Sequence, residues 1–126
     1  MKPKKVLLVD DEVEFCKLLK DFLECEGYLV DVAHDAEEGL AKAIQFEPEL
    51  VLLDIRMPNK DGFYFMDNIK GLNAVQIIII TAIQDSSIME RCSQLGIRHF
   101  IFKPIDLMET KAIIEDTLRR DSLIPT

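Results

Sequence analysis

The stretch KVLLVDD, residues 5–11, is a short apolar run that ends in two adjacent carboxylates. Three later runs also end in a polar side chain: LVLLD at 50–54, IIIIT at 77–81 and FIFK at 100–103. Short, branched apolar runs between helical patterns are typical of buried parallel strands. The carboxyl ends of such strands meet at one edge of the sheet, which is where open α/β sheets bind their ligands. The sequence therefore predicts a polar site at that edge.

Strand and helix patterns alternate along the whole chain. We expect strands at residues 5–10, 28–33, 49–54, 76–81 and 98–102. We expect helices at residues 13–26, 36–46, 63–71, 86–95 and 107–120. Five βα units with short connections predict a parallel sheet with helices on both faces. If acids after the first and third strands share one ion, these strands are neighbours. This predicts a doubly wound, flavodoxin-like α/β fold with five strands in the order 2-1-3-4-5 and five helices.

Helix start signals support these boundaries. Asp35 is followed three residues later by Glu38, and Asp106 by Glu109, which is the capping-box pattern at a helix N-terminus. Asp85 is in position to cap the helix expected from residue 86.

Composition excludes several classes of protein. The 126 residues suit one domain, expected over 1–126 with a frayed tail at 121–126. No apolar stretch approaches the roughly 20 residues of a membrane helix, and the amino terminus lacks a signal-peptide pattern, so we expect a cytoplasmic protein without membrane contact. A net charge of −8 without a basic stripe argues against direct nucleic-acid binding. The three cysteines predict neither a disulfide framework nor a zinc site.

The clustered acids point to a cation. Two like charges about 4 Å apart repel by about 4 kcal/mol at an effective dielectric constant near 20, and a divalent cation removes that penalty. Magnesium prefers one or two carboxylates, several waters and a phosphate oxygen. Asp11 and Asp54 suit the ligand role, and Asp10 could hold a metal-bound water. A backbone carbonyl near Arg56 could complete the protein ligands.

The same residues suit phosphoryl transfer. A carboxylate can act as a nucleophile, and Asp54 is the candidate because it ends a central strand and opens a loop. Phosphoryl transfer needs positioning and neutralisation of the phosphoryl oxygens. Lys103, a compact cation, could take one oxygen, and the Thr81 hydroxyl another. Pro104 restricts the backbone of Lys103, and a cis bond between them is compatible with the pattern.

Four motifs, in this order, resemble the receiver domain of two-component response regulators: Val9-Asp10-Asp11, Asp54 with Pro58 and Gly62, Thr81-Ala82, and Lys103-Pro104. The resemblance covers essentially the whole chain. It is strongest to the free-standing receivers of phosphorelays and chemotaxis, or to a receiver cut from a longer regulator.

The resemblance implies a phosphorelay function. Asp54 would accept a phosphoryl group from a phosphohistidine on a sensor histidine kinase or a histidine phosphotransfer protein. Asp10 and Asp11 would bind Mg²⁺, and Lys103 would pair with the phosphoryl group. Such a domain is a signalling receiver rather than an enzyme, although it promotes its own Mg²⁺-dependent phosphorylation and dephosphorylation.

The resemblance also implies a switch. Thr81 would move toward the phosphoryl group, and Phe100 would turn inward behind it. The surface of the fourth helix, fifth strand and fifth helix would then change for a downstream protein target, and a dimer through the fourth and fifth helices is compatible with this scheme. Relatives often have tyrosine where this chain has Phe100, so a hydrogen bond seen in some of them is missing here.

Alternative interpretations remain open. The chain could be a degenerate receiver that binds proteins without phosphorylation, although the five site residues of the family are intact. A phosphatase with an aspartyl intermediate would have a second acid where Arg56 stands. Arg56 and Ile83 each lie two residues beyond a site residue, and we hypothesise that this bulky pair slows hydrolysis of the phosphorylated form. His34 and His99 show no metal-ligand spacing and are interpreted as ordinary.

Overall fold

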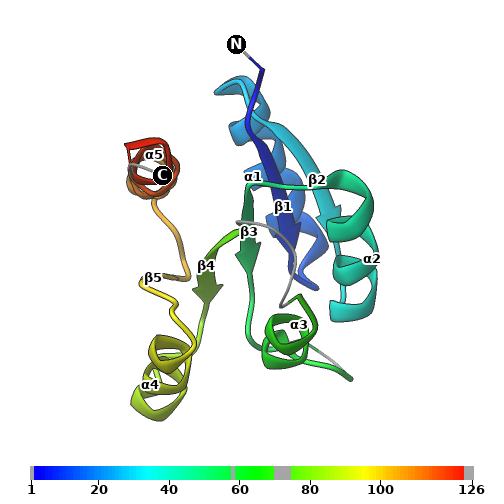
Figure 1. The fold of residues 1–126 in the computed structure, drawn as a ribbon, viewed down its shortest axis with the longest axis vertical. Helices are drawn as coiled ribbons and strands as arrows, with labels where there is room; N and C mark the ends of the chain where they lie inside the picture. The colour runs from blue at the N-terminus through cyan, green and yellow to red at the C-terminus, as the bar shows by residue number, and fades with distance from the viewer. Residues whose placement is uncertain (1, 58, 70–74, 124–126) are drawn as a thin grey trace.

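The five strands form one parallel sheet in the computed structural model, which describes residues 2–57, 59–69 and 75–123. They are β1 (Lys5–Val9), β2 (Leu29–Ala33), β3 (Leu50–Leu53), β4 (Gln76–Thr81) and β5 (His99–Phe102). Their order is β2-β1-β3-β4-β5, and every neighbouring pair is parallel. The predicted doubly wound α/β fold is therefore confirmed (Figure 1).

Each strand is followed by a helix within the described residues. The helices are α1 (Val13–Cys25), α2 (Ala36–Phe46), α3 (Gly62–Ile69), α4 (Ser86–Gln94) and α5 (Leu107–Leu123). The expected boundaries differ from these by at most three residues, apart from residues 70 and 71 of the expected third helix, which lie outside the described part. Because α5 continues to Leu123, the first three residues of the expected tail are helical. Residues 124–126 lie outside the described residues.

Two apolar clusters hold the helices on opposite faces of the sheet. Successive side chains of a strand point to opposite faces. Leu7 and Val9 therefore pack in the cluster that includes buried residues of α2, α3 and α4. Val6 and Leu8 pack in the cluster that includes buried residues of α1 and α5. A strand that is buried on both faces must be apolar throughout, which explains the unbroken apolar runs.

The three predicted caps are present. Asp35 accepts a hydrogen bond from the backbone N–H of Glu38 at 2.7 Å, and Asp106 accepts one from that of Glu109 at 2.9 Å. Asp85 accepts one from the N–H of Ser87 at 2.8 Å. These carboxylates start α2, α5 and α4 directly after the carboxyl edge of the sheet, so the helix starts border the expected site.

None of the helices in the described part of the chain has both the length and the apolar character that a membrane crossing requires.

Candidate functional site

Strand register brings Asp10 and Asp54 to the same edge of the sheet. β1 pairs with β3 so that Val9 lies opposite Leu53, and each aspartate directly follows the last residue of its strand. The N–H of Asp54 donates to the carbonyl of Val9 at 2.9 Å, which continues the ladder by one residue. Asp10 is 3% exposed and Asp54 is 6% exposed, so both carboxylates are largely removed from water.

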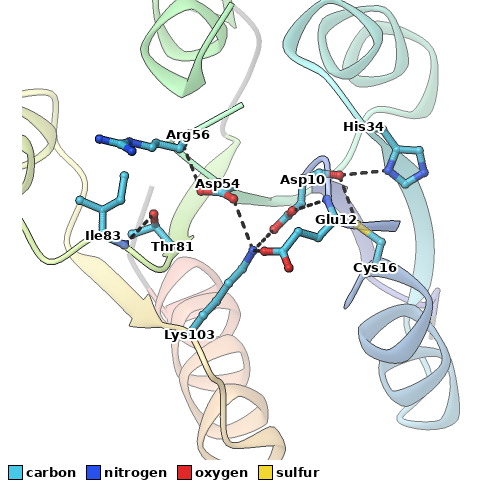
Figure 2. Close-up of polar contacts among 9 residues, drawn as sticks. All are labelled: Asp10, Glu12, Cys16, His34, Asp54, Arg56, Thr81, Ile83 and Lys103. Carbon is cyan, nitrogen blue, oxygen red and sulfur yellow. Dashed lines mark hydrogen bonds and ion pairs between the residues drawn. The ribbon is translucent and has the colours of Figure 1, made fainter. Parts of the chain in front are cut away.

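Lys103 reaches this pair from the end of β5. Its backbone N–H donates to the carbonyl of Thr81 at 2.9 Å, and its peptide bond to Pro104 is cis. The ammonium nitrogen lies 2.8 Å from Asp10 Oδ2 and 3.4 Å from Asp54 Oδ2. Figure 2 shows the lysine side chain directed between the two carboxylates. The predicted meeting of the first, third and fifth strand ends is therefore present in the structure.

A third carboxylate in the cluster belongs to Glu12, which the sequence analysis did not single out. Its side chain pairs with the ammonium of Lys103 (Figure 2). Asp10, Glu12 and Asp54 each offer one carboxylate oxygen, and the three oxygens lie within 4.8 Å of one another. Glu12 directly follows the aspartate pair and has a longer side chain. Both facts are visible in the sequence, but the contact of Glu12 with Lys103 depends on how the strands and helices pack.

Asp11 lies outside this group of three acids. Its side chain is exposed and, together with Arg56, lines an open cavity of about 610 Å³ beside the cluster. Asp11 lies at a bend in the connection between β1 and α1. Asp11 is thus placed at the cavity beside the cluster, and its expected role as a metal ligand stays a prediction.

The cluster carries more negative than positive charge. Burial raises the pKa of Asp10 and of Asp54 above the ordinary value, and the nearby ammonium of Lys103 offsets part of that rise. Burial alone would lower the pKa of Lys103, but its contacts with Asp10 and Glu12, together with the charges of Asp10 and Asp54, raise it on balance. The lysine therefore stays charged, and one ammonium faces three carboxylates.

One oxygen of the cluster lacks a hydrogen bond within the described part of the chain. Asp10 Oδ2 is buried, and although Lys103 lies 2.8 Å away, the contact does not have hydrogen-bond geometry. A buried carboxylate oxygen without a hydrogen bond favours a cation beside it, and the ammonium of Lys103 holds that place here. The donor set consists of oxygens only, which is the set that Mg²⁺ prefers. The residues present therefore fit a magnesium ion.

Thr81, Arg56 and Ile83 border Asp54 on the side of β4 (Figure 2). Thr81 is 3% exposed, and its hydroxyl accepts a hydrogen bond from the N–H of Ile83 at 3.3 Å. The backbone N–H of Arg56 donates to Asp54 Oδ1 at 3.1 Å, while the arginine side chain is exposed. The backbone of the loop after β3 is therefore bonded to the Asp54 side chain, and the backbone of the loop after β4 to the Thr81 side chain.

Phe100 is placed on β5 opposite Ile79 and packs, partly buried, against the cluster that includes α2, α3 and α4 residues. Pro58, which belongs to one of the motifs, lies outside the described residues.

Comparison with known proteins supports one family. The family described as "Response regulator receiver domain" matches residues 6–115. The transcriptional regulatory protein ResD of Bacillus subtilis (strain 168) is 34% identical over 118 residues, which are 94% of this chain and 49% of ResD. CpxR of Escherichia coli (strain K12) is 37% identical over 118 residues, 92% of this chain and 50% of CpxR. The chain thus spans about half the length of these curated relatives.

Solved structures agree. A CheY-like response regulator receiver domain protein from Methanospirillum hungatei JF-1 has a TM-score of 0.90 and 28% identity, and the match covers 95% of this chain and 97% of that one. A chain from the CheX-CheY-BeF3-Mg complex of Borrelia burgdorferi has a TM-score of 0.84 and 31% identity, over 92% and 90% of the two chains. Fold, strand-end residues and sequence match agree, and the chain belongs to the family of response regulator receiver domains of two-component systems.

Proposed function

We propose that this receiver accepts a phosphoryl group on Asp54 from a phosphohistidine of a sensor histidine kinase or a histidine phosphotransfer protein. The observation that carries the proposal is the position of Lys103. Its ammonium lies 3.4 Å from Asp54 Oδ2 at the carboxyl edge of the sheet. A nucleophilic carboxylate beside a fixed cation is the arrangement that phosphoryl transfer requires.

The transfer exchanges one bond to phosphorus for another. A carboxylate oxygen of Asp54 attacks the phosphorus atom, and the bond from phosphorus to the imidazole nitrogen breaks. The electron pair of that bond stays on the imidazole, which takes up a proton from solvent. Lys103 then binds a phosphoryl oxygen in place of a carboxylate, and the Thr81 hydroxyl donates to another. The receiver therefore promotes its own phosphorylation and, with water as the attacking group, its own dephosphorylation.

Asp10, Asp11, Asp54 and the backbone carbonyl of Arg56 would hold Mg²⁺, with Glu12 as a further acid of the cluster. The buried Oδ2 of Asp10, which has an ion pair but no hydrogen bond within the described residues, supports this assignment, and so does the cavity that Asp11 and Arg56 both line. When bound, Mg²⁺ supplies positive charge that neutralises the carboxylates and the phosphoryl oxygens.

Thr81 and Phe100 are the proposed switch residues. Contacts made only with the phosphorylated form would shift the population toward the active conformation and change the surface of α4, β5 and α5 for a downstream protein. A dimer through α4 and α5 is compatible with this scheme. The alternative, a degenerate receiver that acts without phosphorylation, is disfavoured by the gathering of Asp10, Asp54 and Lys103 in one buried site.

The test is intact mass after incubation with Mg²⁺ and acetyl phosphate. We expect the wild-type protein to gain one phosphoryl group only when Mg²⁺ is present, and Asp54→Asn to gain none. Asp21→Asn, an exposed position on α1, is the matched control and should behave as the wild type. Absence of any gain, from acetyl phosphate and from a phosphohistidine protein alike, would favour the degenerate receiver.

A further inference from the structure

Two side chains converge on the backbone carbonyl of Asp10. His34 Nδ1 lies 3.0 Å from this oxygen, and Cys16 Sγ lies 3.4 Å from it (Figure 2). His34 comes from the connection between β2 and α2, and Cys16 from α1. The N–H of Asp10 is also held, because it donates to the carbonyl of Ala33 at 3.0 Å. Both peptide groups of Asp10 are therefore held by contacts from other parts of the chain.

The direction of the histidine contact follows from its acceptor. A carbonyl oxygen only accepts, so Nδ1 of His34 carries the hydrogen and donates it. The histidine is itself anchored at the start of α2. Its backbone N–H donates to Glu38 Oε1 at 3.0 Å, and the N–H of Glu38 donates to Asp35 Oδ1 at 2.7 Å. His34 is thus tied to the first turn of α2 through the Glu38 side chain, which restricts its movement.

The carbonyl of Asp10 controls the direction of the residues that follow it. The N–H of Glu12 donates back to Asp10 Oδ1 at 2.9 Å, and the carbonyl of Glu12 accepts the N–H of Cys16 at 3.0 Å as α1 begins. Rotation of the peptide group after Asp10 would therefore displace the carboxylates of Asp10 and Glu12 together. We propose that His34 is a positioning residue: its hydrogen bond to the Asp10 carbonyl holds the acid-bearing connection between β1 and α1 in place at the site.

Cys16 supports the same carbonyl but cannot replace the histidine. Burial raises the pKa of the Cys16 thiol to about 12, so the sulfur keeps its hydrogen at neutral pH. A thiol is nevertheless a weaker donor than an imidazole N–H. We therefore assign the larger share of the positioning to His34.

The test compares His34→Ala with His34→Asn, because the asparagine amide can donate from about the place of Nδ1. His99→Ala on β5 is the matched control. The first readout needs no metal. It is the amide hydrogen exchange rate of residues 10–13, measured by NMR. The second is the Mg²⁺ dissociation constant from calorimetry, and this part of the inference rests on the proposed function. The melting temperature of each variant is recorded as well.

We expect His34→Ala to speed exchange of the Glu12 amide and to weaken Mg²⁺ binding about tenfold, as loss of an outer-shell partner typically does. His34→Asn should restore most of both, and His99→Ala should change neither. Unchanged exchange and affinity in His34→Ala, or a lower melting temperature alone, would overturn the inference. If the wild type binds no Mg²⁺, the metal part of the proposed function fails, and the exchange data still decide whether His34 holds the connection.

Discussion

Replacement of Lys103 by methionine tests the electrostatics of the site most directly. The side chain of Lys103 is 10% exposed, and those of Asp10 and Asp54 are 5% and 7% exposed. Methionine keeps much of the length and apolar volume of the lysine stem but removes its charge. Within the described residues, the Lys103→Met variant leaves the buried acids without their cation.

The geometry sets the size of the effect. Carboxylate oxygens of Asp10, Glu12 and Asp54 lie within 4.8 Å of one another, so each ionised pair repels by at least about 3.5 kcal/mol at an effective dielectric constant near 20. Removal of one partner from a buried ion pair typically costs about 3–5 kcal/mol. We expect the free energy of unfolding of metal-free Lys103→Met to fall by about 3 kcal/mol near neutral pH, at the low end of that range because Glu12 is exposed and can turn away.

The loss should depend on pH. The pKa values of Asp10 and Asp54 are raised in the folded protein, so the folded state takes up protons before the unfolded state as pH falls. Stability therefore decreases as pH rises through that window and recovers below it. Without Lys103 the two pKa values should rise further. The deficit of the variant should then be largest near neutral pH and shrink toward the ordinary aspartate pKa of 3.8.

The assay is urea unfolding of metal-free wild type and variant near neutral pH and at about one pH unit above the ordinary aspartate pKa. Lys111→Met, which removes the 3.0 Å pair with Glu26 on the surface, should show little loss at either pH. The double variant Lys103→Met with Asp54→Asn should recover part of the stability. Equal deficits at both pH values would refute the reasoning, because they would point to loss of the cation–π contact with Phe15, whose ring centroid is 4.4 Å from the ammonium.

Three further predictions follow from the same region. Gly62→Ala should lower the free energy of unfolding by about 1–3 kcal/mol in urea titration, because the new Cβ would lie 2.9 Å from backbone atoms after β3. Asp11→Asn should weaken Mg²⁺ binding in calorimetry by more than the roughly tenfold loss typical of an outer-shell partner, because Asp11 is a proposed direct ligand, and Glu12→Gln should weaken it less; the reverse order would assign the ion to the observed cluster. Arg56→Asn and Ile83→Glu should each speed hydrolysis of the phosphoryl group several-fold, measured by intact mass over time. Unchanged rates in both variants would contradict the hypothesis that these two side chains shield the phosphoryl group from water.

Local patterns were sufficient to predict the fold and its family. A buried parallel strand has to be apolar on both faces, so β1, β3 and β4 are visible as unbroken runs. The caps at Asp35 and Asp85 are equally local, because a side chain there meets N–H groups only two or three residues away. Residues that end such strands must then meet at one edge, and this rule predicted that Asp10 and Asp54 lie side by side.

Contacts between distant segments depend on packing and could not be predicted from those patterns. Lys103 and Glu12 are separated by 91 residues, and their pairing depends on how the side chains leave β1 and β5. The exposure of Asp11, in place of a position in the cluster, has the same origin. The hydrogen bond from His34 to the Asp10 carbonyl spans 24 residues and needs the start of α2 to lie beside the end of β1. Local sequence patterns thus determine the strands, the helix caps and the family. Which acids contact Lys103, and which side chains hold them in place, is decided only when the sheet and the helices pack together.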